Sequence, residues 1–182
     1  MASPLQFPAL YASHAGIWLA TPDGDTRAVS KGEAVGRAAE TPMIMLNAPL
    51  LAQRLGYADL SGLDLLELFA FVHPTRFMVP TPKGLASVLG LTPSDNDEAV
   101  ARLLLVAAEK LLTALTDPTW PEREGAWSAA QNLARLRWPW ANAVTARLSP
   151  PDGAERWLFS RLPEWEEAPP RTPPKVVTLE PE

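Results

Sequence analysis

The stretch MIMLNAPLLAQRLG, from Met43 to Gly56, decides the fold more than any other part of this sequence. Its first four residues are a continuous apolar run between turn residues, which is typical of a strand buried on both faces. Asn47 then forms a polar corner. Pro49 suits the first turn of a helix, and Gly56 suits the position just after the helix end, where left-handed backbone is common. The stretch therefore predicts an α/β fold with a buried strand and a helix over Pro49–Leu55.

The sequence immediately downstream repeats the same alternation. Leu60–Leu63 predicts a short strand, and Asp64 stands where an N-cap side chain accepts backbone amide protons. Glu67 follows at the capping-box spacing, and the helix is expected to run through Phe71. Another short helix is predicted over Pro82–Leu89.

Upstream, a hairpin is expected to open the domain. The β-type residues of Gly16–Thr21 and Thr26–Val29 flank a turn made of proline, aspartate and glycine. Lys31–Glu40 then predicts a short helix that ends at Thr41-Pro42. These elements predict a small mixed sheet, from about Gly16 to Leu63, flanked by helices.

The second half of the chain is predicted to be almost entirely helical. Asp95 to Glu98 favour the start of a long amphipathic helix that runs to about Leu115, with apolar residues at helical spacing. Three further helices are expected at Pro121–Leu136, Trp140–Leu148 and Ala154–Leu162.

Three segments follow from this organisation: an α/β core over residues 1–116, a helical extension packed on it over 117–162, and a linker over 163–182. The last segment is acidic and rich in proline, which favours an extended chain of polyproline character. The predicted core comprises Ile17, Leu19, Ile44, Leu46, Leu51, Leu55, Leu65, Leu68, Leu104 and Leu111.

Composition excludes several classes of site. The 182 residues carry a net charge of -5, which opposes a broad basic surface that tracks phosphates. Cysteine is absent, so disulfides and thiolate metal sites are excluded. The two histidines, His14 and His73, lack metal-ligand spacing, and no metal site is predicted. Neither a signal peptide nor a membrane span is recognisable, and we expect a cytoplasmic protein.

The stretch LNAPLLAQRLGYADLSGLDLLELFAFVHP, followed by KGLASVLGL, resembles the middle of proofreading-type 3′-5′ exonuclease domains of the ribonuclease-H-like class. In that class a strand ends in an asparagine, an aspartate begins the next helix, and a leucine-rich helix follows. The resemblance implies a ribonuclease-H-like fold. It also implies two metal ions, Mg²⁺ or Mn²⁺, held by four carboxylates. Two of these, an aspartate and a glutamate, lie on the first strand, one aspartate follows shortly after the asparagine, and another lies on a later helix.

The carboxylates themselves are largely missing, which predicts a degenerate core without catalysis. Asn47 matches the asparagine, whereas the expected first strand, Ile17–Thr21, contains no acid. Asp64 fits the third acidic position, and Asp95 or Asp97 fits the fourth. Helix capping is the alternative role for these three aspartates, and the sequence favours it.

A second resemblance covers nearly the whole chain. The segments YASHAGIWLA, LDLLELFAFVHP, PTPKGLA, PEREGAWSA, LRWPWA and AERWLFSRLPEWEE are similar to the N-terminal region of alphaproteobacterial DinG-type ATP-dependent DNA helicases. This resemblance implies a helicase motor in cis that uses ATP and Mg²⁺. The chain itself has no phosphate-binding loop of the G-x-x-x-x-G-K-[ST] type, so we expect no cofactor within it.

One cluster interleaves arginine with tryptophan, as a platform for single-stranded DNA would. The alternative is that these tryptophans are core anchors with arginine stems packed over them. The cluster consists of Arg123, Trp127, Arg135, Arg137, Trp138 and Trp140.

These observations predict a non-catalytic accessory domain of a DinG-type helicase that positions DNA or a partner. Two alternatives remain open at this point. One is a metal-dependent 3′-5′ exonuclease, and the other is a module that binds only proteins.

Overall fold

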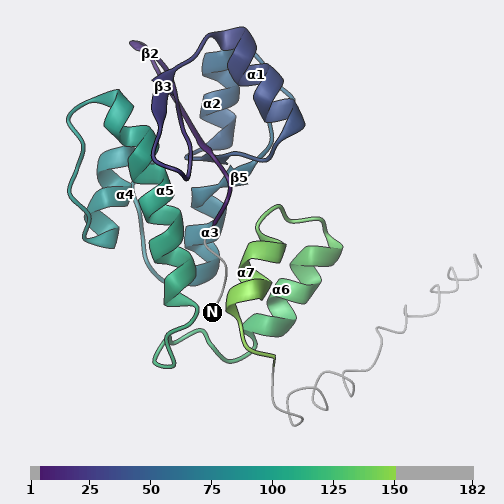
Figure 1. Ribbon diagram of the computed structural model, residues 1–182. Coiled ribbons are helices and arrows are strands. Elements are labelled where there is room, and N and C mark those ends of the chain that lie inside the picture. The colour runs from purple at the N-terminus through teal and green to yellow at the C-terminus, as the bar shows by residue number, and fades with distance from the viewer. Residues whose placement is uncertain (1–4, 151–182) are drawn as a thin grey trace, which may run out of the picture. The chain divides into compact units, whose positions relative to one another are not determined.

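The computed structural model describes residues 5–150, and within them it has an α/β fold, as the sequence predicts (Figure 1). Five strands and seven helices make up this part of the chain. The strands are β1 (Ala9–Ser13), β2 (Gly16–Ala20), β3 (Thr26–Ala28), β4 (Ile44–Met45) and β5 (Leu63–Asp64). The helices are α1 (Lys31–Glu40), α2 (Ala48–Leu55), α3 (Leu65–Val72), α4 (Pro82–Leu89), α5 (Asp97–Ala114), α6 (Ala126–Arg135) and α7 (Ala141–Arg147).

The strands form one mixed sheet in the order β3-β2-β1-β4-β5. Strand β2 runs antiparallel to both of its neighbours, whereas β1, β4 and β5 run parallel to one another. The carboxyl ends of these three parallel strands therefore lie at the same edge of the sheet.

Strand β1 corrects the prediction that the sheet begins at Gly16. It occupies the centre of the sheet and pairs with β2 through contacts such as Leu10 opposite Leu19, and with β4 through Ala9 opposite Ile44. The sequence ALYAS has two alanines and no β-branched residue, so its own strand propensity is weak. Pairing on both sides makes it a strand.

Helices cover both faces of the sheet, with α1 and α2 on one side and α4 and α5 on the other (Figure 1). Alternate residues of β1 serve the two cores. Leu10 and Ala12 pack with α1 and α2, whereas Ala9 and Tyr11 pack on the side of α3 and α5. Nine of the ten predicted core residues are buried, and Ile17 is only partly buried at the edge of the α1–α2 core.

The helix ends explain why several boundaries were predictable from the sequence. Helices α2 and α4 each have proline in the first turn and end at a glycine with left-handed backbone, Gly56 (φ 63°) and Gly90 (φ 66°). The N–H of each glycine donates to carbonyls of the last helical turn. The long helix α5 begins after its N-cap, Asn96, whose side chain accepts a hydrogen bond from the Ala99 N–H.

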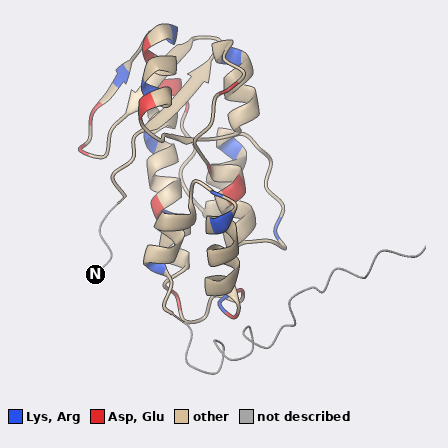
Figure 2. Cartoon of the chain, turned by 90° about the vertical axis from the view of Figure 1, so that its right-hand side faces the viewer, with Lys and Arg blue, Asp and Glu red and all other residues tan. Residues whose placement is uncertain are grey.

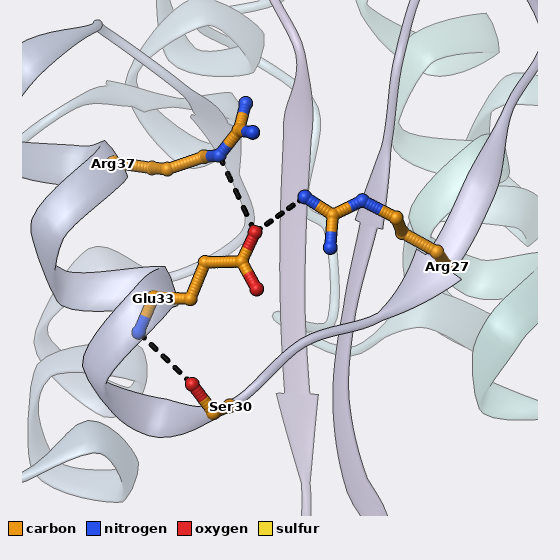
Figure 3. Close-up of polar contacts among 4 residues, drawn as sticks. All are labelled: Arg27, Ser30, Glu33 and Arg37. Atoms are coloured by element: carbon orange, nitrogen blue, oxygen red, sulfur yellow. Dashed lines mark hydrogen bonds and ion pairs between the residues drawn. The ribbon is translucent and has the colours of Figure 1, made fainter.

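A single carboxylate connects helix α1 to the edge strand β3. Glu33 accepts a hydrogen bond from Arg27 of β3 and lies 3.6 Å from Arg37, one turn along α1 (Figure 3). The Ser30 hydroxyl accepts a hydrogen bond from the Glu33 N–H at 3.1 Å. The hydrogen bond from Arg27 lowers the pKa of Glu33 below its ordinary value. Because these side chains are largely exposed, the contact orients α1 more than it stabilises the fold.

The last two described helices are shorter than predicted. Residues 121–125 form turns, and α6 begins only at Ala126, because the left-handed Gly125 (φ 80°) precedes it. Helix α7 keeps the predicted position within one residue at each end. The helix expected at Ala154–Leu162 and the linker over 163–182 lie outside the described residues.

The segment from residue 117 to residue 150 shares its hydrophobic core with the α/β elements. Trp120, Ala130, Trp140 and Val144 belong to the same buried cluster as α3, α4 and α5. Residues up to Pro150 accordingly form one compact unit.

Candidate functional site

Ligands in open α/β sheets bind beside the carboxyl ends of the parallel strands, and the residues predicted from the exonuclease resemblance lie near this edge. Ser13 ends β1, Asn47 follows β4 and Asp64 ends β5. Asp97 begins α5, and its carboxylate accepts a hydrogen bond from the Ser13 hydroxyl. The fold thus brings the N-terminus of α5 to the end of the central strand.

Asp64 is the only buried charged residue of the described chain, at 6% exposure, and both of its carboxylate oxygens accept hydrogen bonds from the backbone. Its Oδ1 accepts from the N–H groups of Leu66 and Asn47, both at 3.0 Å, and its Oδ2 accepts from the Ala48 N–H at 2.7 Å. The first of these bonds caps α3, so the capping prediction is confirmed for Asp64. The other two hold the corner between β4 and α2. The capping prediction is wrong for Asp95 and Asp97, because Asn96 between them caps α5.

Asn47 has a comparable structural role. Its backbone is left-handed (φ 61°), a conformation that asparagine tolerates better than most residues. Its side-chain oxygen accepts a hydrogen bond from the Leu50 N–H at 3.3 Å and so caps α2. Asn47 and Asp64 together connect the ends of β4 and β5 to the helices that follow them.

The aspartates before and at the start of α5 have different environments. Asp95 is exposed, whereas Asp97 is half-buried and bonded to Ser13. Between residues 5 and 150, no group of three or more histidine, aspartate and glutamate side chains lies close enough to hold a metal ion. The three aspartates therefore do not form the shared carboxylate cluster that a two-metal nuclease requires.

Two residues that the sequence reasoning missed lie beside Asp97. The Arg54 side chain donates to the Ala12 carbonyl at 2.6 Å, a position that β4 leaves unpaired because it ends at Met45. Arg54 also hydrogen-bonds the Tyr11 hydroxyl. Burial raises the pKa of Tyr11, the charge of Asp97 adds to this effect, and Arg54 opposes it.

The polar cluster formed by Tyr11, Ser13, Arg54 and Asp97 has too little negative charge to favour a divalent cation. The cluster contains one carboxylate and one guanidinium, whereas hard divalent cations need several oxygen ligands with net negative charge. The signal in the sequence was the alternation in β1, which puts Tyr11 and Ser13 on the same face of the sheet.

The tryptophans of the second half are mainly anchors on α3. The indole N–H of Trp140 donates to the Asp64 carbonyl, and that of Trp120 donates to the Val72 carbonyl, each at 2.8 Å. Trp138 hydrogen-bonds Glu67, and its ring centroid lies 5.3 Å from that of Phe71. Trp140 is completely buried, so it cannot stack on a base, which corrects its inclusion in a DNA platform.

The remaining members of that predicted cluster stay accessible. Trp127 and Trp138 are half-buried, and Arg123, Arg135 and Arg137 are exposed. Arg137 has left-handed backbone (φ 61°) just after α6, and the N–H of Trp138 donates to the Leu133 carbonyl across this turn. The turn directs Trp138 back toward α3. In the view of Figure 2, basic and acidic positions are interspersed over the described residues.

Glu67 makes the stability of the contact between α3 and Trp138 depend on pH. Burial raises the pKa of Glu67, the charge of Asp64 adds to the increase, and the hydrogen bond from Trp138 partly offsets it. A carboxyl group whose pKa is raised by folding makes its full contribution to stability at a pH below its pKa in the unfolded chain, which is about 4.3. This contribution is lost as the pH rises through the pKa of the folded protein.

We therefore expect Glu67→Gln to be more stable than the wild type at neutral pH, by about 0.5 kcal/mol or less, and equally stable at acid pH. Glutamine keeps an acceptor for Trp138 but carries no charge. Urea unfolding of both proteins at neutral and acid pH measures the difference. A loss of stability at neutral pH that is absent at acid pH would show instead that the charged hydrogen bond to Trp138 outweighs the burial of Glu67.

Comparison of the chain with protein-family models, with curated proteins and with solved structures finds no match. Over residues 5–150, no helix has the length and apolar character needed to span a membrane.

Proposed function

We propose that this chain is a non-catalytic accessory domain of a DinG-type ATP-dependent DNA helicase, built on a degenerate ribonuclease-H-like exonuclease core. Its role is to position DNA or a protein partner beside a motor in the same polypeptide, in the cytoplasm. ATP and Mg²⁺ would act at that motor.

The local geometry of the resembling stretch supports the ribonuclease-H-like part of the proposal. Asn47 follows strand β4 and caps the next helix, and Asp64 caps the helix after that. The leucine-rich sequence GLASVLG lies in α4 and its C-cap. These features follow the order that the exonuclease resemblance implies.

The proposal that the chain is non-catalytic rests on one observation, namely which side chains lie at the edge of the sheet where the parallel strands β1, β4 and β5 end. The central strand β1 presents Tyr11 and Ser13; Ser13 donates to Asp97, and Arg54 contributes a positive charge close to Tyr11. Both oxygens of Asp64 already accept backbone N–H groups. A two-metal mechanism needs carboxylates that are free to bind the ions.

An exonuclease assay tests this part of the proposal. We expect the purified chain to leave labelled single-stranded DNA intact in the presence of Mg²⁺ or Mn²⁺. Degradation that EDTA stops, and that both Asp97→Asn and Asp64→Asn abolish, would establish the exonuclease alternative instead. Circular dichroism of the two variants checks that they remain folded.

The helicase part has a separate test. The protein isolated from its own cells is expected to be much larger than the 19.8 kDa of this chain and to hydrolyse ATP when DNA is added. A native protein of about this mass without ATPase activity would leave the module that binds only proteins as the better description.

A further inference from the structure

A groove of about 1000 Å³ runs along α5. One wall comes from α4 and from the residues that follow α3, and the turn between β2 and β3 also contributes. The volume lies at the upper end of the range for ligand sites. The groove does not involve the carboxyl edge of the sheet described above.

The floor of the groove is apolar at positions where a surface helix is normally polar. Leu105 is half-buried and Val106 is 48% exposed, although the opposite side of α5 already fills the core with residues such as Leu104. Val88 of α4 extends the apolar lining. Contact with a partner would remove this surface from water.

Three cationic side chains border the apolar floor, and none has a carboxylate partner within the described chain. Arg102 donates to the Gly24 carbonyl and to the Thr26 hydroxyl, the latter at 2.9 Å, and Arg76 donates to the Val88 carbonyl at 2.9 Å. Both guanidinium groups are thus held in place by neutral acceptors. The third cation is Lys110, which is exposed.

The acidic side chains that line the same groove are already engaged. Glu109 forms an ion pair with Arg147 at 2.9 Å. The Asp117 carboxylate accepts hydrogen bonds from the N–H and the hydroxyl of Thr119, which lower the pKa of Asp117. Glu109 is thus neutralised by Arg147 and only Asp117 opposes the three cations, so the net charge of the groove is positive, in a chain whose net charge is -5.

The spacing of the cations restricts the ligand further. Arg102 and Lys110 lie on one helix eight residues apart, which corresponds to about 12 Å along its axis. A second helix with two acidic residues seven or eight positions apart would meet both cations and place apolar residues between them. The groove lining has no tryptophan, tyrosine or phenylalanine on which bases would stack, so single-stranded DNA fits it less well.

We infer that this groove binds an acidic, amphipathic helical segment of a partner protein. Apolar residues of the segment contact Val88, Leu105 and Val106, and its carboxylates pair with Arg102 at one end and with Lys110 and Arg76 at the other. This site is independent of the proposed helicase role, because none of its residues belongs to the carboxyl edge or to the arginine and tryptophan cluster.

Selection from a displayed library of short helical peptides tests the inference with the whole chain as bait. We expect enrichment of sequences with two acidic residues seven or eight positions apart and leucine or isoleucine between them. Fluorescence anisotropy with an enriched peptide then compares variants. Lys110→Glu and Val106→Asp are each expected to weaken binding about tenfold or more, with a strong dependence on salt for the wild type.

Lys31→Glu is the matched control, since it makes the same change of charge on α1, which covers the opposite face of the sheet. It should leave peptide binding unchanged. Circular dichroism confirms that each variant folds, and both groove positions are exposed enough for this to be expected. Enrichment without acidic residues, or binding that neither groove variant weakens, would overturn the inference. So would binding of oligothymidine that Lys110→Glu weakens while peptides fail to bind.

Discussion

Trp140→Ala is expected to lower the free energy of unfolding by about 3–5 kcal/mol, a large part of the stability of a domain of this size. Trp140 is completely buried and is the largest such side chain in the described residues. The substitution leaves a cavity between α7 and α3. It also removes the hydrogen bond to the Asp64 carbonyl, which is then buried without this donor.

Urea unfolding followed by far-ultraviolet circular dichroism measures this effect without relying on tryptophan fluorescence. Trp127→Ala is the matched control, because Trp127 is a half-buried tryptophan of α6. The loss of stability in Trp127→Ala should be clearly smaller than that in Trp140→Ala. If the two variants lose the same stability, Trp140 is not the anchor that its burial indicates, and α6 and α7 contribute little to the common core.

Asp64→Ala is expected to cost about 3 kcal/mol of stability, the second largest effect we predict. The substitution leaves the N–H groups of Asn47, Ala48 and Leu66 without their acceptor at a buried position. Because Asn47 and Ala48 begin α2 and Leu66 lies in α3, the starts of two helices lose their connection at once. For a domain of this size the midpoint of thermal unfolding should fall by about 10 °C.

Differential scanning calorimetry checks this value, and two variants sharpen the interpretation. Asp64→Asn keeps one acceptor oxygen but turns an amide group toward the remaining N–H groups, so an intermediate loss is expected. Asp95→Ala is the control, because Asp95 is exposed and Asn96, not Asp95, caps α5. A loss at Asp95 as large as that at Asp64 would contradict the structural role assigned to Asp64.

Local sequence signals predicted the elements whose ends are set by capping. Proline in the first turn and glycine at the end fixed α2 and α4, and Asn96 with its acidic neighbours fixed the start of α5. These signals act within a single turn of the chain, so they do not depend on the fold. The capping role of Asp64 was predictable for the same reason.

Elements without such local signals were missed or misjudged. The sequence ALYAS has little strand propensity, and β1 forms because Leu10 and Ala9 find partners on β2 and β4. The start of α6 was placed too early, because the turns over residues 121–125 contain residues that also suit a helix. The hydrogen bonds from the N–H groups of Asn47 and Ala48 to Asp64 join residues 17 and 16 positions apart, so no local signal indicated them.

The sequence by itself determined the α/β class and the ends of the helices that carry capping signals, because residue identity and short-range spacing are sufficient for these. The tertiary structure decided which polar groups meet. It placed Arg54 beside Tyr11 and buried Trp140 against α3. It also left Arg76, Arg102 and Lys110 around an apolar groove without acidic partners in the described residues. These contacts depend on the packing of segments that lie far apart in the chain, so no local sequence pattern predicts them.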